Sequence, residues 1–240
     1  MFAIESIRAA RAQADHRNPK SYAARMRAHR AKRIRRLIDG TAARRGACDI
    51  VDPGGLASYW AAVGYDYLRT RKVHVTLINL RQVQTSLDLA DLFPSVRDDA
   101  AAPPYPDRLW DLCHSNSVIE HIAGWKRKAA FARKVARLAP AHYIQTPNYW
   151  FPIEPHYLLP DLLPAVHWLP QPCRTWVLKR ASLGGRYDET EVCELLTAAE
   201  LRRLFPSSTL IPEHVGPFVK SWMVIGDDQQ RQNAHVGEPP

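Results

Sequence analysis

Cysteine is scarce in this sequence, with four residues in 240, and no two of them form a C-x-x-C pair. The four lie far apart, and three of them lie inside apolar segments; they are Cys48, Cys113, Cys173 and Cys193. This spacing excludes the common zinc and dithiol motifs and favours buried free thiols over disulfides. We therefore expect a reducing, cytoplasmic setting.

Long apolar runs are also absent. No stretch approaches the roughly 18–20 apolar residues that a membrane span requires, and the N-terminus lacks the apolar core of a secretory signal. We therefore expect no membrane span. With 46% apolar and 24% charged residues, the composition is ordinary for a globular protein. A chain of 240 residues is also long enough to bury a sizeable core.

Acidic residues are few only at the N-terminal end. Residues 1–46 contain 13 Lys and Arg against three acids, whereas the remainder contains 20 against 21. The whole excess of the formal net charge of +9 therefore lies in the first segment. We predict that residues 1–46 form a basic helical extension, that 47–228 form the main domain, and that the polar residues 229–240 form a disordered tail.

The extension contains a helix-forming stretch from Ser21 to Ile38 with a thin apolar stripe. The stripe consists of Tyr22, Met26, Ile34, Leu37 and Ile38. It predicts a helix that packs on the domain with its arginines in solvent. Two alternatives stay open. The arginines could bind the phosphates of a nucleic acid, although no aromatics alternate with them, or the helix could lie on a membrane surface.

Strand and helix patterns alternate along the rest of the chain. Apolar or β-branched runs predict strands at 47–52, 73–80, 110–113, 142–145, 210–214 and 221–225. Helices are expected at 56–67, 118–138 and 197–204, the last with a capping box formed by Thr197 and Glu200. A further short element is expected at 87–93. Alternating strands and helices are typical of an α/β fold with a parallel sheet.

The stretch from Cys113 to Pro160 is the most informative. SNSVIEH follows the predicted strand 110–113, and TPN follows the predicted strand 142–145, so polar groups gather at the carboxyl ends of two consecutive strands. This sequence pattern resembles that of class I S-adenosylmethionine-dependent methyltransferases of the ubiquinone-biosynthesis type (the methyltransferase type 11 group). The resemblance extends over roughly residues 47–226. It implies an α/β, Rossmann-like, seven-stranded and mostly parallel sheet with one antiparallel edge strand and helices on both faces.

The resemblance also implies an activity: transfer of a methyl group from S-adenosylmethionine to an oxygen or nitrogen of a small-molecule acceptor. Two rival functions remain. The chain could be a catalytically degenerate binding protein on this fold, since Pro53, Asn79 and Ser117 depart from the family pattern. It could also be an RNA-modifying methyltransferase that uses the basic residues 1–46.

The first strand-to-helix turn is a candidate cofactor site. Glycines permit positive φ and a close approach of a ligand to the backbone, and the following helix offers free N–H groups. Asp52, Gly54 and Gly55 match a shortened form of the family's acid-x-Gly-x-Gly motif, with Pro53 in place of an apolar residue. The resemblance assigns these three residues to the cofactor.

Further cofactor residues follow from the resemblance. Asn79 stands where an acid would hold the ribose hydroxyls, and an amide oxygen can still accept one hydrogen bond. Asp99 and Ala100 match the family's "GDA", in which the acid meets the adenine amino group, with Asp98 in place of the glycine. Ser115, at the end of the fourth strand, completes the expected cofactor set.

The adjacent Glu120 and His121 are candidate catalytic residues, because an acid beside an imidazole can orient or deprotonate a hydroxyl. A structural role beneath the cofactor is an equal alternative. Some relatives hold a divalent metal with E-x-x-E-H, but this chain has Ser117 in place of the first acid. No metal site is therefore predicted.

The proline-rich segment 148–176 is expected to form a lid over the acceptor pocket, with Tyr149 and Trp150 among its aromatics. His156 is the preferred general base on the acceptor side, and Glu154 would orient it. These aromatics could equally fasten an irregular segment to the core.

Overall fold

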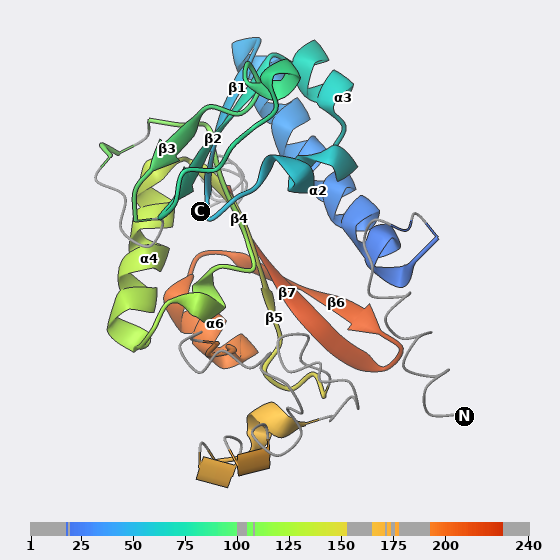
Figure 1. The fold of residues 1–240 in the computed structure, drawn as a ribbon. Coiled ribbons are helices and arrows are strands. Elements are labelled where there is room, and N and C mark those ends of the chain that lie inside the picture. Colours follow the sequence, from blue (N-terminus) through green and yellow to red (C-terminus); the bar gives the residue numbers. More distant parts are fainter. Residues whose placement is uncertain are drawn as a thin grey trace, which may run out of the picture.

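The β-branched and apolar runs form one sheet, seen in the computed structural model in Figure 1. The structure describes residues 18–227 except 19, 100–104, 108, 153–164, 171, 174–175 and 178–192. The strands are β1 Cys48–Pro53, β2 Val73–Asn79, β3 Ser95–Arg97, β4 Leu112–Asn116, β5 Ala141–Pro147, β6 Thr209–Val215 and β7 Phe218–Asp227. The α-helices are α2 Tyr22–Arg45, α3 Tyr65–Thr70, α4 Trp125–Leu138 and α6 Ala198–Leu204. The 3₁₀ turns are η1 Ala57–Ala62, η2 Leu87–Leu89, η3 Ile119–His121 and η5 Val166–Trp168.

The seven strands follow the order β3-β2-β1-β4-β5-β7-β6. The pairings from β3 to β5 are all parallel, whereas β7 runs antiparallel between β5 and β6. The predicted Rossmann-like, seven-stranded, mostly parallel sheet is therefore confirmed. Its antiparallel pairings are confined to the edge that β6 and β7 form.

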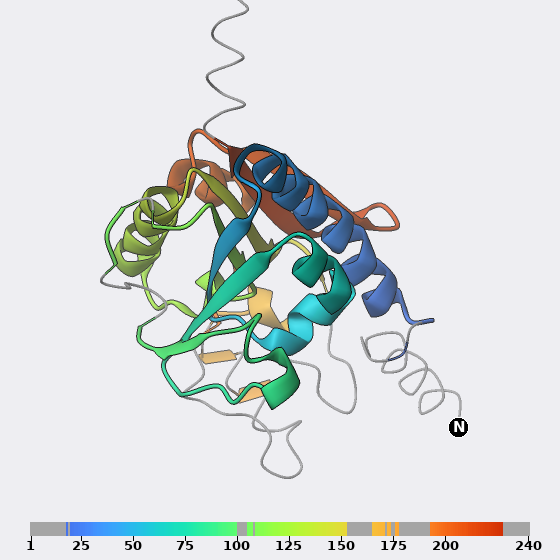
Figure 2. The ribbon, with the colours of Figure 1, turned by 90° about the horizontal axis from the view of Figure 1, so that it is seen from above.

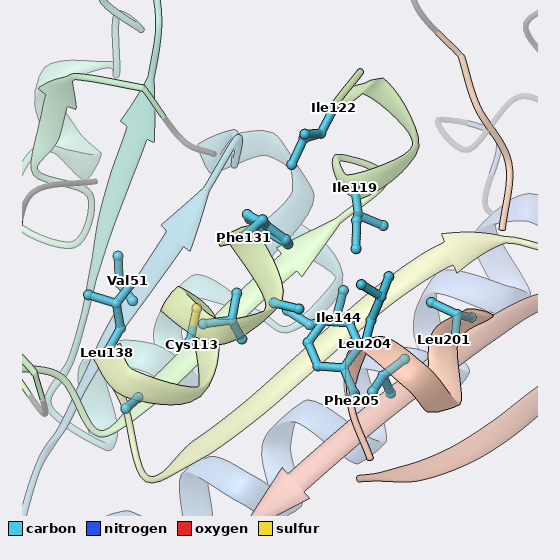
Figure 3. Close-up of a cluster of buried hydrophobic side chains, with 14 of the residues drawn as sticks. Val51, Cys113, Ile119, Ile122, Phe131, Leu138, Ile144, Leu201, Leu204 and Phe205 are labelled. Atoms are coloured by element: carbon cyan, nitrogen blue, oxygen red, sulfur yellow. The ribbon is translucent and has the colours of Figure 1, made fainter. Parts of the chain in front are cut away.

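Helices cover both faces of the sheet, as predicted, and Figure 2 shows the two layers from above. Alternate residues of each strand point to opposite faces and join two separate apolar cores. Val51 and Ile144 pack against α4 and α6, in the cluster drawn in Figure 3. Ile50 and Tyr143 pack on the other face, against α2 and η1. This arrangement leaves the carboxyl edge of the sheet for loops.

Helix α2 begins at Ser21, whose side chain accepts a hydrogen bond from the Ala24 N–H. It runs to Arg45, beyond the predicted end, and stops at Gly46, which adopts φ 77°. Ile34 and Ile38, from the predicted stripe, are fully buried in the core. The helix therefore contributes to the core of the sheet through its apolar face.

The two longest expected helices after α2 are interrupted. The segment 56–67 forms η1 and α3, which meet at Gly64 with φ 98°. The segment 118–138 forms η3 and α4, with Gly124 at φ 75° between them. Both glycines have a positive φ, which favours glycine, and each one is the N-cap of the helix that follows. The polar groups after β4 consequently lie on a short 3₁₀ turn and not on a long helix.

The cysteines are all free thiols, but their burial differs from the prediction. Cys48 and Cys113 are buried, Cys193 is half-buried and Cys173 is exposed. Cys173 lies in the segment between β5 and α6. Among the described residues, no helix is long and apolar enough to cross a membrane.

Candidate functional site

Strand β1 is the point where the strand order reverses, because it pairs with β2 on one side and with β4 on the other. In open α/β sheets, ligands bind outside the carboxyl ends of the strands at such a point. The loops after β1, β2 and β4 all leave from this edge of the sheet. Asp52, Asn79 and Ser115 lie in the last residues of these strands, and Gly54 and Gly55 follow β1 directly.

The Gly54-Gly55 turn is held tightly at the end of β1. The Gly54 N–H donates to the Ile78 carbonyl at 2.7 Å, and Gly54 adopts φ 77°. A Cβ atom at Gly54 would lie 2.4 Å from Cγ2 of Val118, and one at Gly55 would lie 2.0 Å from Oδ2 of Asp52. Glycine is therefore required at both positions by the protein's own packing, before any ligand is considered.

Asp52 holds this turn from behind. Its carboxylate accepts one hydrogen bond from Trp60 Nε1 at 2.9 Å, and its Oδ1 lies 2.9 Å from His114 Nδ1. All three side chains are buried. Within the described residues, His114 Nε2 has no hydrogen-bond partner, and its ring stacks on Tyr143 with centroids 5.6 Å apart. Asp52 therefore supports the turn and does not present its carboxylate to the crevice.

Sequence reasoning missed the role of His114 and Trp60. The available signal was the histidine inside an otherwise apolar strand: in β4, His114 shares a face with the buried Leu112. A buried imidazole requires a partner, and the acid at the end of the neighbouring strand is the nearest candidate by register.

Burial also raises the pKa of Tyr59, which packs beside His114, to about 12, with Asp52 adding to the effect.

Ser115 links β4 to β1 through a side-chain hydrogen bond. Its hydroxyl donates to the Pro53 carbonyl at 3.0 Å, and the residue is buried. This contact joins the end of β4 to the end of β1. Ser117, the next residue but one, adopts φ 55°, an uncommon conformation for a residue other than glycine. The backbone thus turns sharply where β4 leaves the sheet.

Asn79 is the last residue of β2, and Asp99 follows the end of β3. Asn79 Nδ2 donates to the Gly55 carbonyl at 2.9 Å, which leaves its Oδ1 on the other side of the amide. The Asp99 carboxylate is partly exposed and lies 3.4 Å from Arg127 Nη2. Both residues can thus offer an oxygen acceptor at the crevice. Ala100 lies outside the described residues.

Glu120 and His121 lie on η3, after β4. Glu120 is fully buried, and its Oε2 accepts from Thr146 Oγ1 at 2.9 Å. The Glu120 carbonyl also accepts from the Glu194 N–H at 2.7 Å. Glu120 therefore joins η3, β5 and the segment before α6, and His121 is half-buried beside it.

The predicted lid is described only in part. His156 and Glu154 lie outside the described residues. At the start of the segment, the Tyr149 carbonyl accepts from Trp168 Nε1 at 2.8 Å and lies 2.8 Å from His167 Nε2. Trp150 is 61% exposed. Within the described residues, no group of three or more His, Cys, Asp or Glu could hold a metal ion.

A buried ion pair lies over the carboxyl ends of β4 and β5 and was not predicted. Arg30 of α2 donates to both oxygens of Glu213, at 2.9 and 3.1 Å. Its Nη1 also donates to Asn116 Oδ1 at 3.2 Å. Burial and the charge of Arg30 lower the pKa of the nearby Lys220. One of the cations of α2, Arg30, is thus buried in the domain at this edge of the sheet.

The sequence matches no protein-family model and no curated protein. Among solved structures, it is similar to a possible exported protein from Bordetella parapertussis, with 19% identity over 81% of this chain and a TM-score of 0.48. The match spans 66% of that protein, just under two thirds of its length.

Two further structures show similarity at the same level. A SAM-dependent methyltransferase from Aquifex aeolicus has 12% identity, coverage of 75% of this chain and 81% of the other, and a TM-score of 0.43. The 1,6-didemethyltoxoflavin-N1-methyltransferase from Burkholderia thailandensis has 13% identity, coverage of 80% and 76%, and a TM-score of 0.46. Similarity at this level carries no information about activity, which has to be argued from the residues of the site.

Proposed function

We propose that the protein is an S-adenosylmethionine-dependent methyltransferase that acts on an oxygen or nitrogen of a small molecule. The observation that carries the proposal is the position of the Gly54-Gly55 turn. It lies at the carboxyl end of β1, where the strand order reverses, and the Asn79 amide bonds directly to it. Asp99 follows β3, which is separated from β1 by β2 in the sheet.

The residues at these three strand ends fit the parts of the cofactor. The partly exposed turn at Gly54 and Gly55 would lie along the methionine part. Asn79 Oδ1 would accept a hydrogen bond from a ribose hydroxyl, and Asp99 would accept one from the adenine amino group, with Ala100 beside it. Asp52 and Ser115 would hold the turn in place. The cofactor supplies an electrophilic methyl group on a sulfonium sulfur.

The chain's own contribution to methyl transfer would be mainly alignment. The reaction is an in-line displacement, so the acceptor atom must lie opposite the leaving sulfur, and a base helps only where the acceptor carries a proton. His156 is the proposed base, with His121 as the alternate. Glu120, which is buried against Thr146, would act on His121 by fixing η3.

Calorimetric titration with S-adenosylmethionine tests the cofactor. We expect Asp99→Ala to weaken binding by about 1–3 kcal/mol if its hydrogen bond is shielded from water. Asp91→Ala, another exposed acid paired with an arginine, is the matched control and should bind like wild type. A well-folded wild type that does not bind the cofactor would overturn the proposal.

Turnover then assigns the base. His156→Ala should leave cofactor affinity intact and lower methyl transfer roughly 10²-fold. A parallel loss of cofactor binding would make the histidine structural. If turnover is untouched while His121→Ala abolishes it, the roles of the two histidines are reversed.

A binding protein on a degenerate methyltransferase fold is the second candidate. It is favoured by Asn79, since an amide lacks the charge-assisted hydrogen bond that a carboxylate makes with ribose hydroxyls. Cofactor binding without turnover on any acceptor would support it. The cytoplasmic location and the division at residue 46 remain predictions.

A further inference from the structure

A cleft of about 500 Å³ opens between the end of β5, the first turn of α6 and the tight turn between β6 and β7. Its lining includes Asn148, Trp150, Thr197, Arg202, Phe218 and Trp222. The volume falls within the range of small-molecule sites. The cleft lies on the face of the sheet that α4 and α6 cover, whereas Asp52 and His114 lie on the other face.

Two residues that line this cleft each have a buried polar atom with no hydrogen-bond partner among the described residues: Asn148 Oδ1 and Trp222 Nε1. Asn148 is only 5% exposed, and its Nδ2 donates to the Val219 carbonyl at 2.8 Å, which fixes the orientation of the amide. Buried polar groups are nearly always paired in folded proteins. An acceptor and a donor left unpaired at one cleft therefore indicate a ligand that pairs with both.

Aromatic rings and one cation complete the lining. Trp150 and Phe218 line the cleft and are 61% and 54% exposed, so much of each ring is accessible to a bound molecule. Arg202 is exposed on α6, and the lining contains no Asp or Glu. The cleft is thus positively charged and rich in aromatic surface, which suits a planar anion.

We propose that this cleft binds a planar aromatic anion that also carries a hydroxyl or ring N–H group. The donor of the ligand bonds to Asn148 Oδ1, and Trp222 Nε1 donates to an acceptor on the ligand. The ring system lies against Trp150 and Phe218, and the anionic group pairs with Arg202. Both unpaired atoms are shielded from solvent, so a ligand reaches them only when the residues around them move. The site goes beyond the proposed function, because it concerns binding whether or not a methyl group is transferred.

The probe is 6-hydroxy-2-naphthoate, which places a phenol and a carboxylate at opposite ends of two fused rings. Titration of the full chain should show one site. Two analogues separate the contacts: 2-naphthoate lacks the hydroxyl, and 2-naphthol lacks the carboxylate. We expect the loss of the carboxylate to weaken binding roughly tenfold or more and the loss of the hydroxyl roughly threefold or more. Absence of binding, or equal affinity for all three compounds, would overturn the proposal.

Matched variants place the probe in the cleft. Arg202→Met should lower affinity for 6-hydroxy-2-naphthoate but not for 2-naphthol. Replacing the adjacent Arg203, which is also exposed but does not line the cleft, with Met should change neither affinity. Trp222→Phe keeps the ring and removes only Nε1. Because this N–H has no partner in the free protein, the melting temperature should not fall, while probe affinity should. If the probe binds but is indifferent to Arg202 and Trp222, it binds elsewhere and the assignment fails.

Discussion

Gly54 is required by packing, and this limits what a substitution at that position can reveal. Its Cβ would overlap Val118, and its φ of 77° is strained for any other residue. A loss of cofactor binding in a Gly54 variant would therefore reflect a displaced loop as readily as a blocked ligand. Asp99, which is partly exposed, is the better probe of the cofactor.

We expect Gly54→Ala to lower the free energy of unfolding by about 1–3 kcal/mol from backbone strain alone, with a further loss from the overlap with Val118. Gly46→Ala is the matched control: Gly46 has the same φ of 77° but no atom within 4 Å of its Cβ position. Urea unfolding of both variants separates strain from overlap. Adding Val118→Ala should recover only the second part. Equal losses in the two single variants would contradict the argument.

The sequence predicted where individual site residues lie but not which residues they contact. The positions of Asp52, Gly54 and Asn79 at strand ends could be predicted, because strand patterns and polar residues locate those ends. Their partners could not. Asp52 accepts from Trp60, eight residues further on, and pairs with His114, 62 residues further on, and both contacts depend on how the chain folds. No local pattern encodes which side chain a buried carboxylate will meet.

At the scale of elements, α2 is joined to the sheet by apolar packing and by the Arg30–Glu213 pair. Both partners are buried, and Glu213 also accepts from Ser221 Oγ at 2.7 Å. Removing one partner leaves a buried charge without its counterion, which costs more than removing both. The pair is therefore a sensitive test of how firmly α2 is docked.

We expect Arg30→Met to destabilise the protein by about 3–5 kcal/mol. The double variant Arg30→Met with Glu213→Leu should be clearly more stable than the single variant. Arg25→Met, on the exposed side of the same helix, should stay within about 0.5 kcal/mol of wild type. Urea unfolding measures all three. A double variant no more stable than the single one would show that the buried charge is not the cause.

The segment before α6 is joined to α4 by a second pair. Lys128 Nζ, which is buried, lies 2.5 Å from Glu194 Oε2. The hydrogen bond from Lys128, with that from the Gly124 N–H, lowers the pKa of Glu194 below its ordinary value of 4.5. The native state thus binds this proton less readily than the unfolded chain. The stabilisation is present above about pH 4.5 and is lost as the pH falls through the lowered value.

We accordingly expect Glu194→Gln to reduce stability near neutral pH and to converge with wild type in acid. Urea midpoints measured from about pH 6 to about pH 2 follow the convergence. The Glu194 side chain is half exposed, so solvent screening keeps the difference small. Asp91→Asn, in an exposed pair with Arg69, is the control and should show little difference at any pH. A constant gap between Glu194→Gln and wild type would contradict the linkage.

Elements were predicted better than their interruptions. The capping box of Thr197 and Glu200 marked α6 correctly, because both of its hydrogen bonds are local. The breaks at Gly64 and Gly124 were missed, since a single glycine inside a helical pattern does not by itself end a helix. Strand β3 was also missed: it has only three residues and depends on its pairing with β2.

For the whole molecule, the α/β class followed from alternating patterns, and the number of strands followed from the resemblance. The order of the strands in the sheet was not predicted. The sequence predicted that the arginines of the basic helix lie in solvent, but some of them contact the rest of the domain. Arg30 is buried against Glu213, and Arg35 donates to the Val63 carbonyl at 2.8 Å. Part of the basic helix therefore serves the domain, and only its outer face is available to a polyanion.

The outer face of α2 includes Arg25, Lys32 and Arg36. Replacing all three with Gln should leave the melting temperature and the affinity for S-adenosylmethionine unchanged, because the three side chains are exposed. Any RNA binding by wild type should be weak and fall steeply with salt, by a slope of about 0.7 per phosphate contact, and should diminish in the variant. Methyl transfer to a small acceptor should persist in both. If transfer occurs to RNA instead and is lost with the three cations, the RNA-modifying alternative replaces the small-molecule proposal.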